Sequence, residues 1–380
     1  MNTKAILALA FAGLFATISS ADPLGVTVNN IMLDDNGPFS GTGWAYDPDT
    51  CILTLDGAGP VTLSGKDTEG RVRIVVATNV TAEVTLSNLT INMPWWVGSA
   101  SAFALETNAC VSLVLAGENV LQSSDNRAAL EVPAGASLSI TNAPDDTAGA
   151  LFVYGGYQAA AIGGSYGGVC GAVILNGGTV TAEGGYKSAG IGGAYNGSAG
   201  TVTINGGEVI ATGGSGGAGI GGGENRDGGT VTISGGTVFA EGGDYGAGIG
   251  GGGSYNTWNG GNGATVTING GQVTAYGGTY AAGIGGGGSY SYTGGDGGMV
   301  TISGGTVFAE GAFGGADIGP GRSGADGSNR FTGGSICLAG AAVSPAPENN
   351  TEPVFCAVVT GFEPYAPVEI TTGLTGYGVN

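Results

Sequence analysis

Apolar and polar side chains alternate in short segments that recur along residues 157–321. The motif Thr-Val-Thr-Ile occurs at Thr201–Ile204, Thr230–Ile233 and Thr265–Ile268, and each copy is followed by Gly-Gly and a second alternating segment, such as Thr237–Glu241. Successive strand residues point to opposite faces, so the Val and Ile of each motif share one face and the threonines share the other. The pattern predicts short β-strands joined by glycine turns, with Val and Ile pointing inward.

A third motif, Ala-(Ala/Gly/Asp)-Ile-Gly, sets the period of the repeat. Its isoleucines are Ile162, Ile191, Ile220, Ile249, Ile284 and Ile318, which are spaced by 29, 29, 29, 35 and 34 residues. One three-strand coil cannot bury its own apolar face, whereas stacked coils can. We therefore expect an all-β, right-handed parallel β-helix with coils of about 29–35 residues. The two longer units should carry loops inserted at the same corner of adjacent coils.

Equivalent positions of the second strand repeat small apolar residues. Stacking would place these residues one coil apart, at the strand spacing of roughly 4.8 Å. Glycines at the corners allow positive φ angles and close backbone approach. The residues expected inside are Val180, Val209, Val238, Val273 and Val307, with Ala182, Ala211, Ala240, Ala275 and Ala309 beside them.

The two ends of the chain depart from the repeat. The first residues combine a lysine, an apolar stretch and a small-residue cleavage site, which is typical of a secretory signal peptide and predicts a secreted or cell-surface protein. Upstream of the regular repeats, glycines are fewer but strand-like alternation continues. The predicted organisation is a signal peptide (1–21), an N-terminal cap (22–68), a β-helix (69–338) with regular repeats at 157–321, a linker (339–353) and a short C-terminal β segment (354–380) that looks cut short of a complete domain.

Composition narrows the classes of function. The chain has 29 acidic and 9 basic residues and no histidine, and its net charge of −20 disfavours nucleic acid as a partner. After the signal peptide, no apolar stretch is long enough to predict a transmembrane segment. The absence of histidine excludes Ser-His and Cys-His nucleophile pairs and imidazole metal ligands.

The five cysteines form no CxxC metal pattern. Cys110 and Cys170 fall within predicted coils, where we expect them to be buried as small hydrophobic residues. In an exported chain the sequence also allows a Cys337–Cys356 disulfide, and the odd number of cysteines leaves at least one thiol unpaired.

Three parts of the chain carry a resemblance to a known family: the segment GTGWAYDPDTCILTLDGAG at 41–59, the AGIGGG repeats, and the exit from FTGGSICL to VTGFEP. Together, over about residues 41–364, they resemble large Gly-rich, repetitive surface proteins of gut and anaerobic bacteria. Those proteins are described as carbohydrate-binding-domain β-helix proteins of the pectate-lyase-like superfold. The resemblance implies polysaccharide binding, although the superfold also hosts lyases, hydrolases and adhesins.

Catalysis is the first alternative. Pectate lyases of this superfold use an Arg or Lys base beside calcium-binding aspartates, but residues 157–318 contain only Lys187 and Arg226 as basic residues. Polygalacturonases need a histidine, which this chain lacks. We expect a non-catalytic protein without a cofactor. A polysaccharide lyase or two-carboxylate glycoside hydrolase stays open as the alternative, as does a bound calcium ion, for which the sequence identifies no ligands.

Two sets of residues are candidates for carbohydrate binding. Outward positions of the second strand place Phe239, Phe308 and Tyr276 beside Glu241 and Glu310, where rings can stack on sugars and carboxylates can bond hydroxyls. The alternative is that these residues bind nothing and are present only because aromatic side chains favour β-strands.

The inserted loops carry the second set, Tyr255, Trp258, Tyr290 and Tyr292. Tyrosine-rich Gly/Ser loops are typical of adaptable recognition surfaces, but they could equally shield the glycine corner. The leading hypothesis is a secreted or cell-surface β-helix that binds polysaccharide or a cell-surface glycan, or that acts in adhesion. A purely structural stalk or adhesin segment is the other alternative.

Overall fold

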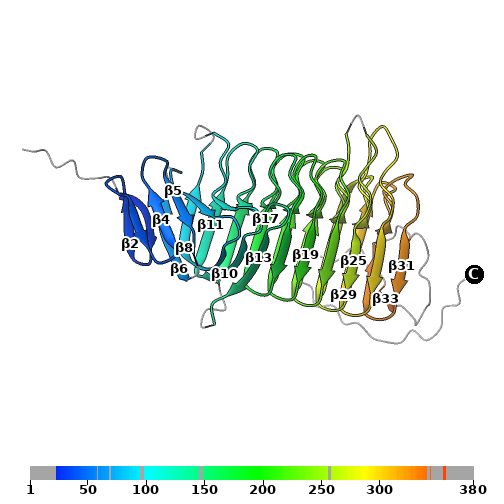
Figure 1. Ribbon diagram of the computed structural model, residues 1–380. Coiled ribbons are helices and arrows are strands. Elements are labelled where there is room, and N and C mark those ends of the chain that lie inside the picture. The colour runs from blue at the N-terminus through cyan, green and yellow to red at the C-terminus, as the bar shows by residue number, and fades with distance from the viewer. Residues whose placement is uncertain are drawn as a thin grey trace, which may run out of the picture.

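The computed structural model describes residues 23–57, 59–67, 70–94, 98–144, 149–255, 258–339, 343 and 354–356. The predicted signal peptide, and almost all of the predicted linker and C-terminal segment, lie outside these residues. The described chain is all β and winds into a right-handed parallel β-helix, as the repeat predicted (Figure 1). None of the described residues forms a helix that could cross a membrane.

Antiparallel strands occupy the N-terminal end of the stack. Strand β1 pairs with β2, β3 pairs with β4, and β4 pairs with β5, all in antiparallel register. Trp44 and Tyr46 are almost fully buried there, so two large aromatic side chains fill the end of the helix interior. The bounds are β1 (Pro23–Val28), β2 (Ile31–Asp34), β3 (Phe39–Gly41), β4 (Trp44–Asp47) and β5 (Ile52–Leu55).

Three columns of parallel strands run along the helix. The Ile column continues from β5 through β7 (Arg73–Val76), β9 (Phe103–Leu105), β12 (Leu130–Glu131), β15 (Ile162–Gly163), β18 (Ile191–Gly192), β21 (Ile220–Gly221), β24 (Ile249–Gly250), β27 (Ile284–Gly285) and β30 (Ile318–Gly319). The TVTI column holds β10 (Cys110–Ala116), β13 (Ser137–Asn142), β16 (Ala172–Leu175), β19 (Thr201–Ile204), β22 (Thr230–Ile233), β25 (Thr265–Ile268), β28 (Met299–Ile302) and β31 (Ser328–Phe331). The TVFA column holds β11 (Glu118–Gln122), β14 (Ala150–Tyr154), β17 (Thr179–Glu183), β20 (Glu208–Thr212), β23 (Thr237–Glu241), β26 (Gln272–Thr279), β29 (Thr306–Ala312), β32 (Ser335–Leu338) and β33 (Val354–Cys356).

Parallel pairing begins earlier than the sequence suggested. Strand β5 pairs in parallel with β7, and β6 (Pro60–Asp67) pairs in parallel with β8 (Thr81–Asn92), which spans the corner between the TVTI and TVFA columns. Residues 52–67 therefore already belong to the coils, although the sequence pattern predicted a cap over 22–68. These strands alternate apolar and polar residues but lack the Gly-Gly turns that marked the repeat.

The regular coils stack identical residues on one another. Val202 lies opposite Val231, Ile204 opposite Ile233, and Ile220 opposite Ile249. The predicted inward Val, Ile and Ala side chains are all at most 2% exposed, while the threonines between them are partly exposed. The interior is thus a column of small branched side chains, whose burial from water stabilises each coil against its neighbours.

Glycines allow the corners to stack backbone on backbone. A Cβ atom built on Gly246 would lie 1.8 Å from the Gly217 carbonyl oxygen of the preceding coil, and one on Gly223 would lie 1.8 Å from the oxygen of Ala194. No side chain fits in these gaps. The many glycines therefore follow from the closeness of neighbouring coils as well as from turn geometry.

Two long loops leave the stack at one corner, as the spacing predicted. They join β24 to β25 and β27 to β28, and Ser254 forms a parallel bridge with Ser289. They rise above the loops of the preceding coils (Figure 1).

The cysteines differ in burial and in whether another cysteine lies nearby. Cys170 is buried as predicted, and burial raises the pKa of its thiol to about 12. Cys110 is exposed, so its predicted burial was wrong: in β10 it takes the outward position next to the inward Val111. The backbones of Cys337 and Cys356 lie opposite each other where β32 pairs with β33. Because the side chain of Cys356 lies outside the described part, the disulfide stays a prediction.

Candidate binding site

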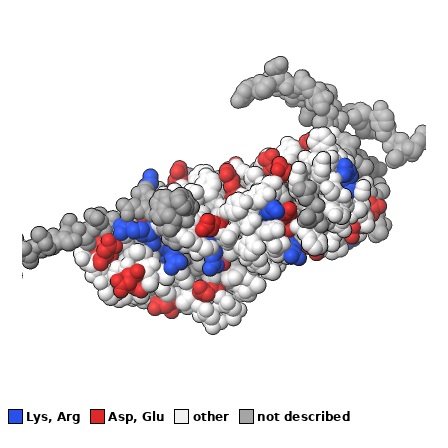
Figure 2. Space-filling model, turned by 90° about the horizontal axis from the view of Figure 1, so that it is seen from above, with Lys and Arg blue, Asp and Glu red and all other residues white. Residues whose placement is uncertain are grey.

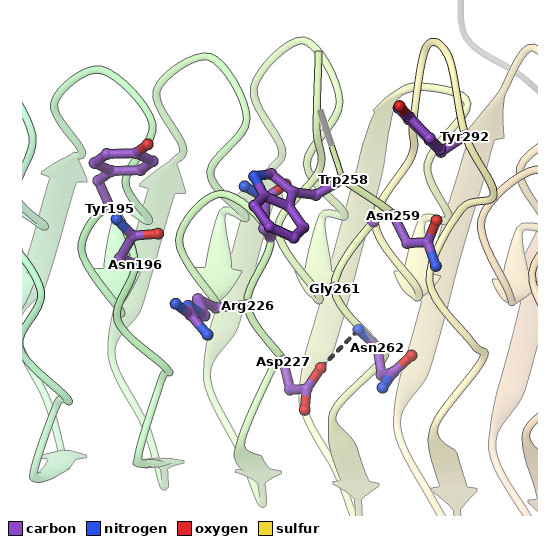
Figure 3. A pocket seen from close by; sticks show the side chains of 11 residues that line it. Tyr195, Asn196, Arg226, Asp227, Trp258, Asn259, Gly261, Asn262 and Tyr292 are labelled. Carbon is purple, nitrogen blue, oxygen red and sulfur yellow. Dashed lines mark hydrogen bonds between the residues drawn. The ribbon is translucent and has the colours of Figure 1, made fainter. Parts of the chain in front are cut away.

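The difference in loop length creates a concavity on the loop-bearing side. The loops after β18 and β21 are short, while those after β24 and β27 are long, so the long loops form a wall beside the short ones. The concavity at this step has a volume of about 680 Å³ (Figure 3). Figure 2 looks onto the same side of the molecule and shows that most of the surface in view is uncharged.

Three aromatic side chains from three coils line the concavity. Tyr195 comes from a short loop, and Trp258 and Tyr292 come from the two long loops (Figure 3). Trp258 is 65% exposed and Tyr292 is 53% exposed. Because these two rings stay largely exposed, folding removes little of their apolar surface from water and they add little to the stability of the fold. They are therefore free to contact a ligand.

Polar groups form the rest of the lining. Asp227 Oδ1 accepts a hydrogen bond from the backbone N–H of Asn262 (2.9 Å), and Asn262 Oδ1 accepts one from the N–H of Asp296 (3.1 Å). These bonds fix consecutive loops to one another. Asn225 lines the concavity, and its Oδ1 is buried without a hydrogen-bond partner within the described residues. The polar lining residues are Asn196, Asn225, Arg226, Asp227, Asn259 and Asn262.

Tyr255 and Tyr290 lie outside this concavity, in a separate group that we call the tyrosine cluster (Tyr245, Tyr255, Tyr280 and Tyr290). The rings of Tyr255 and Tyr290 stack with centroids 5.5 Å apart, and Tyr245 lies 5.7 Å from Tyr255. Burial, followed by the nearby Tyr255 and Asp244, raises the pKa of Tyr245. The cluster joins the long loops to the turn that precedes the Ile column.

The strand candidates form a third group. Tyr276 lies between Phe239 and Phe308, with centroids 5.6 Å from each. Glu241 and Glu310 occupy the positions opposite Tyr276 on the neighbouring strands. The three rings are half-buried and Tyr276 contacts both of the others, so the predicted row exists, but it lies on a strand face apart from the loop concavity.

The nine predicted residues therefore separate into three groups, and the structure adds partners that the sequence analysis did not select. Tyr195, Asn225 and Arg226 join the concavity, while Tyr245 and Tyr280 join the cluster. The two tyrosines occupy the turn before the Ile-Gly motif. A tabulation of that turn along the repeat could have found them.

Two basic side chains lie on aromatic rings near these sites. Lys187 Nζ is 2.7 Å from Glu224 Oε2 and lies over the rings of Tyr186 (5.3 Å) and Tyr195 (4.7 Å). Burial lowers the pKa of Lys187, but the hydrogen bond and charge of Glu224 outweigh it, so the net pKa is raised. Arg322 lies 3.7 Å from the ring centroid of Tyr280. Within the described residues, no cluster of three or more Cys, Asp or Glu could hold a metal ion.

A family model described as "Beta helix repeat" matches residues 173–195, 202–224, 228–253, 266–288 and 300–322. Each match spans a strand of the TVTI column, one of the TVFA column and one of the Ile column, so the chain is similar to β-helix repeats in the part that forms the regular coils. Comparisons with curated proteins and with solved structures found no match.

Proposed function

We propose that this is a secreted or cell-surface, non-catalytic β-helix protein that binds polysaccharide in the loop concavity. One observation carries the proposal: the exposed rings of Trp258 and Tyr292 and the half-buried ring of Tyr195, from three different coils, surround a floor of amide and charged groups.

The chemistry of the lining suits sugars. Aromatic rings can pack against the C–H faces of sugar rings, while Asn225, Asn259 and Asn262 can exchange hydrogen bonds with hydroxyl groups. The concavity runs across several coils, so it can contact more than one sugar unit. A chain ligand therefore fits it better than a single monosaccharide.

The lining favours binding over hydrolysis. Glycoside hydrolases generally place two carboxyl groups about 5–9.5 Å apart around the scissile bond. Among the described residues that line the concavity, Asp227 is the one carboxylate, and its Oδ1 already accepts the N–H of Asn262.

Affinity gel electrophoresis with xylan, soluble cellulose and N-acetylglucosamine polymer tests the proposal. We expect at least one polysaccharide to retard the protein, and Trp258→Ala to weaken the affinity about tenfold, which corresponds to about 1.4 kcal/mol of lost contact. Phe313→Ala is the matched control, because Phe313 is 78% exposed but does not line the concavity.

Other results would support the rival functions. Unchanged migration on every polysaccharide contradicts sugar binding and favours a structural stalk. Release of unsaturated or reducing ends from a polysaccharide favours an enzyme. Because the net charge is −20, retention on pectate should require calcium and disappear in chelator.

A further inference from the structure

In the turn before an Ile strand, the residues five and four positions before the isoleucine form two columns along five regular coils, and all of them except the buried Gly216 are at least partly exposed. Hydrogen bonds from Glu224 N to Lys187 O, from Gly253 N to Gly216 O and from Gly288 N to Tyr245 O show that the three acceptor residues are equivalent in successive coils. The first column, which we name the lysine column after its first member, is Lys187, Gly216, Tyr245, Tyr280 and Gly314. The second, which we name the tyrosine column after Tyr186, is Tyr186, Ser215, Asp244, Thr279 and Phe313.

The coil that contains Lys187 shows how this corner holds an ammonium group. Lys187 Nζ pairs with the Glu224 carboxylate at 2.7 Å and lies over the rings of Tyr186 and Tyr195. A cation over an aromatic face is attracted by the negative face of the ring, and a carboxylate adds charge pairing. The chain's own lysine therefore fills a site made of two tyrosines and one carboxylate.

The next coil has a glycine at the same position. Gly216 leaves a notch of about 220 Å³ between Tyr186 on one side and Tyr245 and Tyr255 on the other. Ser215 and Asp244 also line it, and the Asp244 carboxylate accepts a hydrogen bond from Ser215 Oγ (2.8 Å). The notch thus repeats the tyrosines and the carboxylate that surround Lys187, with Gly216 in place of a second lysine.

The charge of the notch suits one cation. Its charged lining residues are Lys187, Glu224 and Asp244. Lys187 and Glu224 neutralise each other at 2.7 Å, which leaves the charge of Asp244 unbalanced. Tyr245 adds no further charge, because the ordinary tyrosine pKa of 10.0 already keeps the phenol neutral at physiological pH and burial raises that pKa further.

We propose that this notch binds the primary ammonium group of an amino-sugar unit in a polysaccharide. The ammonium would bond Asp244 and lie among Tyr186, Tyr245 and Tyr255, as Lys187 lies against Glu224 and its two tyrosines. The sugar source rests on the proposed function: Glu224 lines the notch and the next residue, Asn225, lines the concavity, so one polysaccharide chain can reach both.

Isothermal titration calorimetry with two tetrasaccharides tests this inference. One is β-1,4-linked tetraglucosamine, and the other is its fully N-acetylated form, which has the same ring skeleton without the charge. We expect the intact protein to bind the amine form about tenfold more tightly at low salt, with the preference shrinking as salt rises.

Three variants locate the effect. Asp244→Asn keeps the shape of the side chain but removes its charge, and Ser215→Tyr fills the notch with a residue that the tyrosine column already holds at Tyr186. Both should abolish the preference for the amine form. Ser215→Ala removes the bond to Asp244 without filling the notch and should keep the preference within about threefold.

The outcomes are separable. Equal affinity for both tetrasaccharides, sensitive to Trp258→Ala, overturns the notch while leaving the proposed function standing. Binding of tetralysine with the same strength and the same dependence on Asp244 overturns the assignment to a sugar. Absence of binding to either tetrasaccharide overturns the inference outright.

Discussion

A regular coil and a long coil of this protein share an interior and differ at one corner. From Ile220 to Ile249 the repeat takes 29 residues, and from Ile249 to Ile284 it takes 35. Ile220 lies opposite Ile249 in the Ile column, and Val231 lies opposite Val266 in the TVTI column. Six additional residues (35 − 29) change none of this pairing, because the insertion leaves the stack at the corner.

The comparison teaches that shape and chemistry are specified at different positions. Inward Ile, Val and Ala set the register, and corner glycines set the closeness of the coils. The exposed side chains of Trp258 and Tyr292 on the long loops contribute to neither. Loop length costs little free energy, since doubling a flexible loop costs only about 0.6 kcal/mol, so the corner can acquire binding residues without disturbing the helix.

The largest effect should come from breaking the backbone stacking that both kinds of coil share. Gly246→Ala would place a Cβ 1.8 Å from the Gly217 oxygen, so the coils would have to separate. We expect the free energy of unfolding in urea to fall by about 4 kcal/mol.

Gly167→Ala is the matched control, because a Cβ there meets nothing within 4 Å and only the positive φ of 69° opposes it. It should cost about 1 kcal/mol. Similar losses in both variants would contradict the role given to the close approach.

An intermediate effect should follow removal of the cation that distinguishes the Lys187 coil from the next one. Lys187→Met leaves the Glu224 carboxylate, whose side chain is 7% exposed, without its partner. We expect a loss of about 3 kcal/mol in the free energy of unfolding, and recovery of most of it in Lys187→Met/Glu224→Met. A double variant as unstable as the single one would argue against an unpaired buried charge as the cause.

This pair also predicts a dependence on pH. The pKa of Lys187 is raised above its ordinary value of 10.5, so the stabilisation is fully present below that value and is lost as pH rises through the folded-state pKa. The difference in unfolding free energy between the intact protein and Lys187→Met should therefore stay constant from pH 7 to 9. It should shrink above about pH 10.5. A difference that grows with pH would have the wrong sign.

The smallest effect on stability should come from converting a long coil into a regular one. Deleting residues 254–259 removes the six additional residues and with them Tyr255 and Trp258. We expect the unfolding free energy to change by about 1 kcal/mol or less, while polysaccharide retardation is lost. Circular dichroism and urea titration measure the first, and affinity gels measure the second. A deletion that unfolds the protein would show that the loops are part of the core.

Much of the fold was accessible from the sequence because alternation and period are local properties. The spacing of Ile162 to Ile318 and the Thr-Val-Thr-Ile motif predicted the coils, the inward residues and the corner of the insertions. The start of the helix was placed too late, since β5 and β6 pair without Gly-Gly turns. The burial of Cys110 was mispredicted because the residue was judged by its type and not by its place in the alternation, in which Val111 and Leu113 point inward and Cys110 points outward.

The sequence by itself determined what each coil repeats, because side chains that recur every 29 to 35 residues must stack on their own copies. It also identified the aromatic residues of the long loops, Tyr255, Trp258, Tyr290 and Tyr292. Only the tertiary structure decided which of these residues meet. Trp258 lines one concavity with Tyr195 and Arg226, and Tyr255 packs instead on Tyr245 and Tyr290. Such groupings depend on the path of each loop. The stacked coils fix the two ends of a loop, but no repeat in the sequence determines where its side chains point.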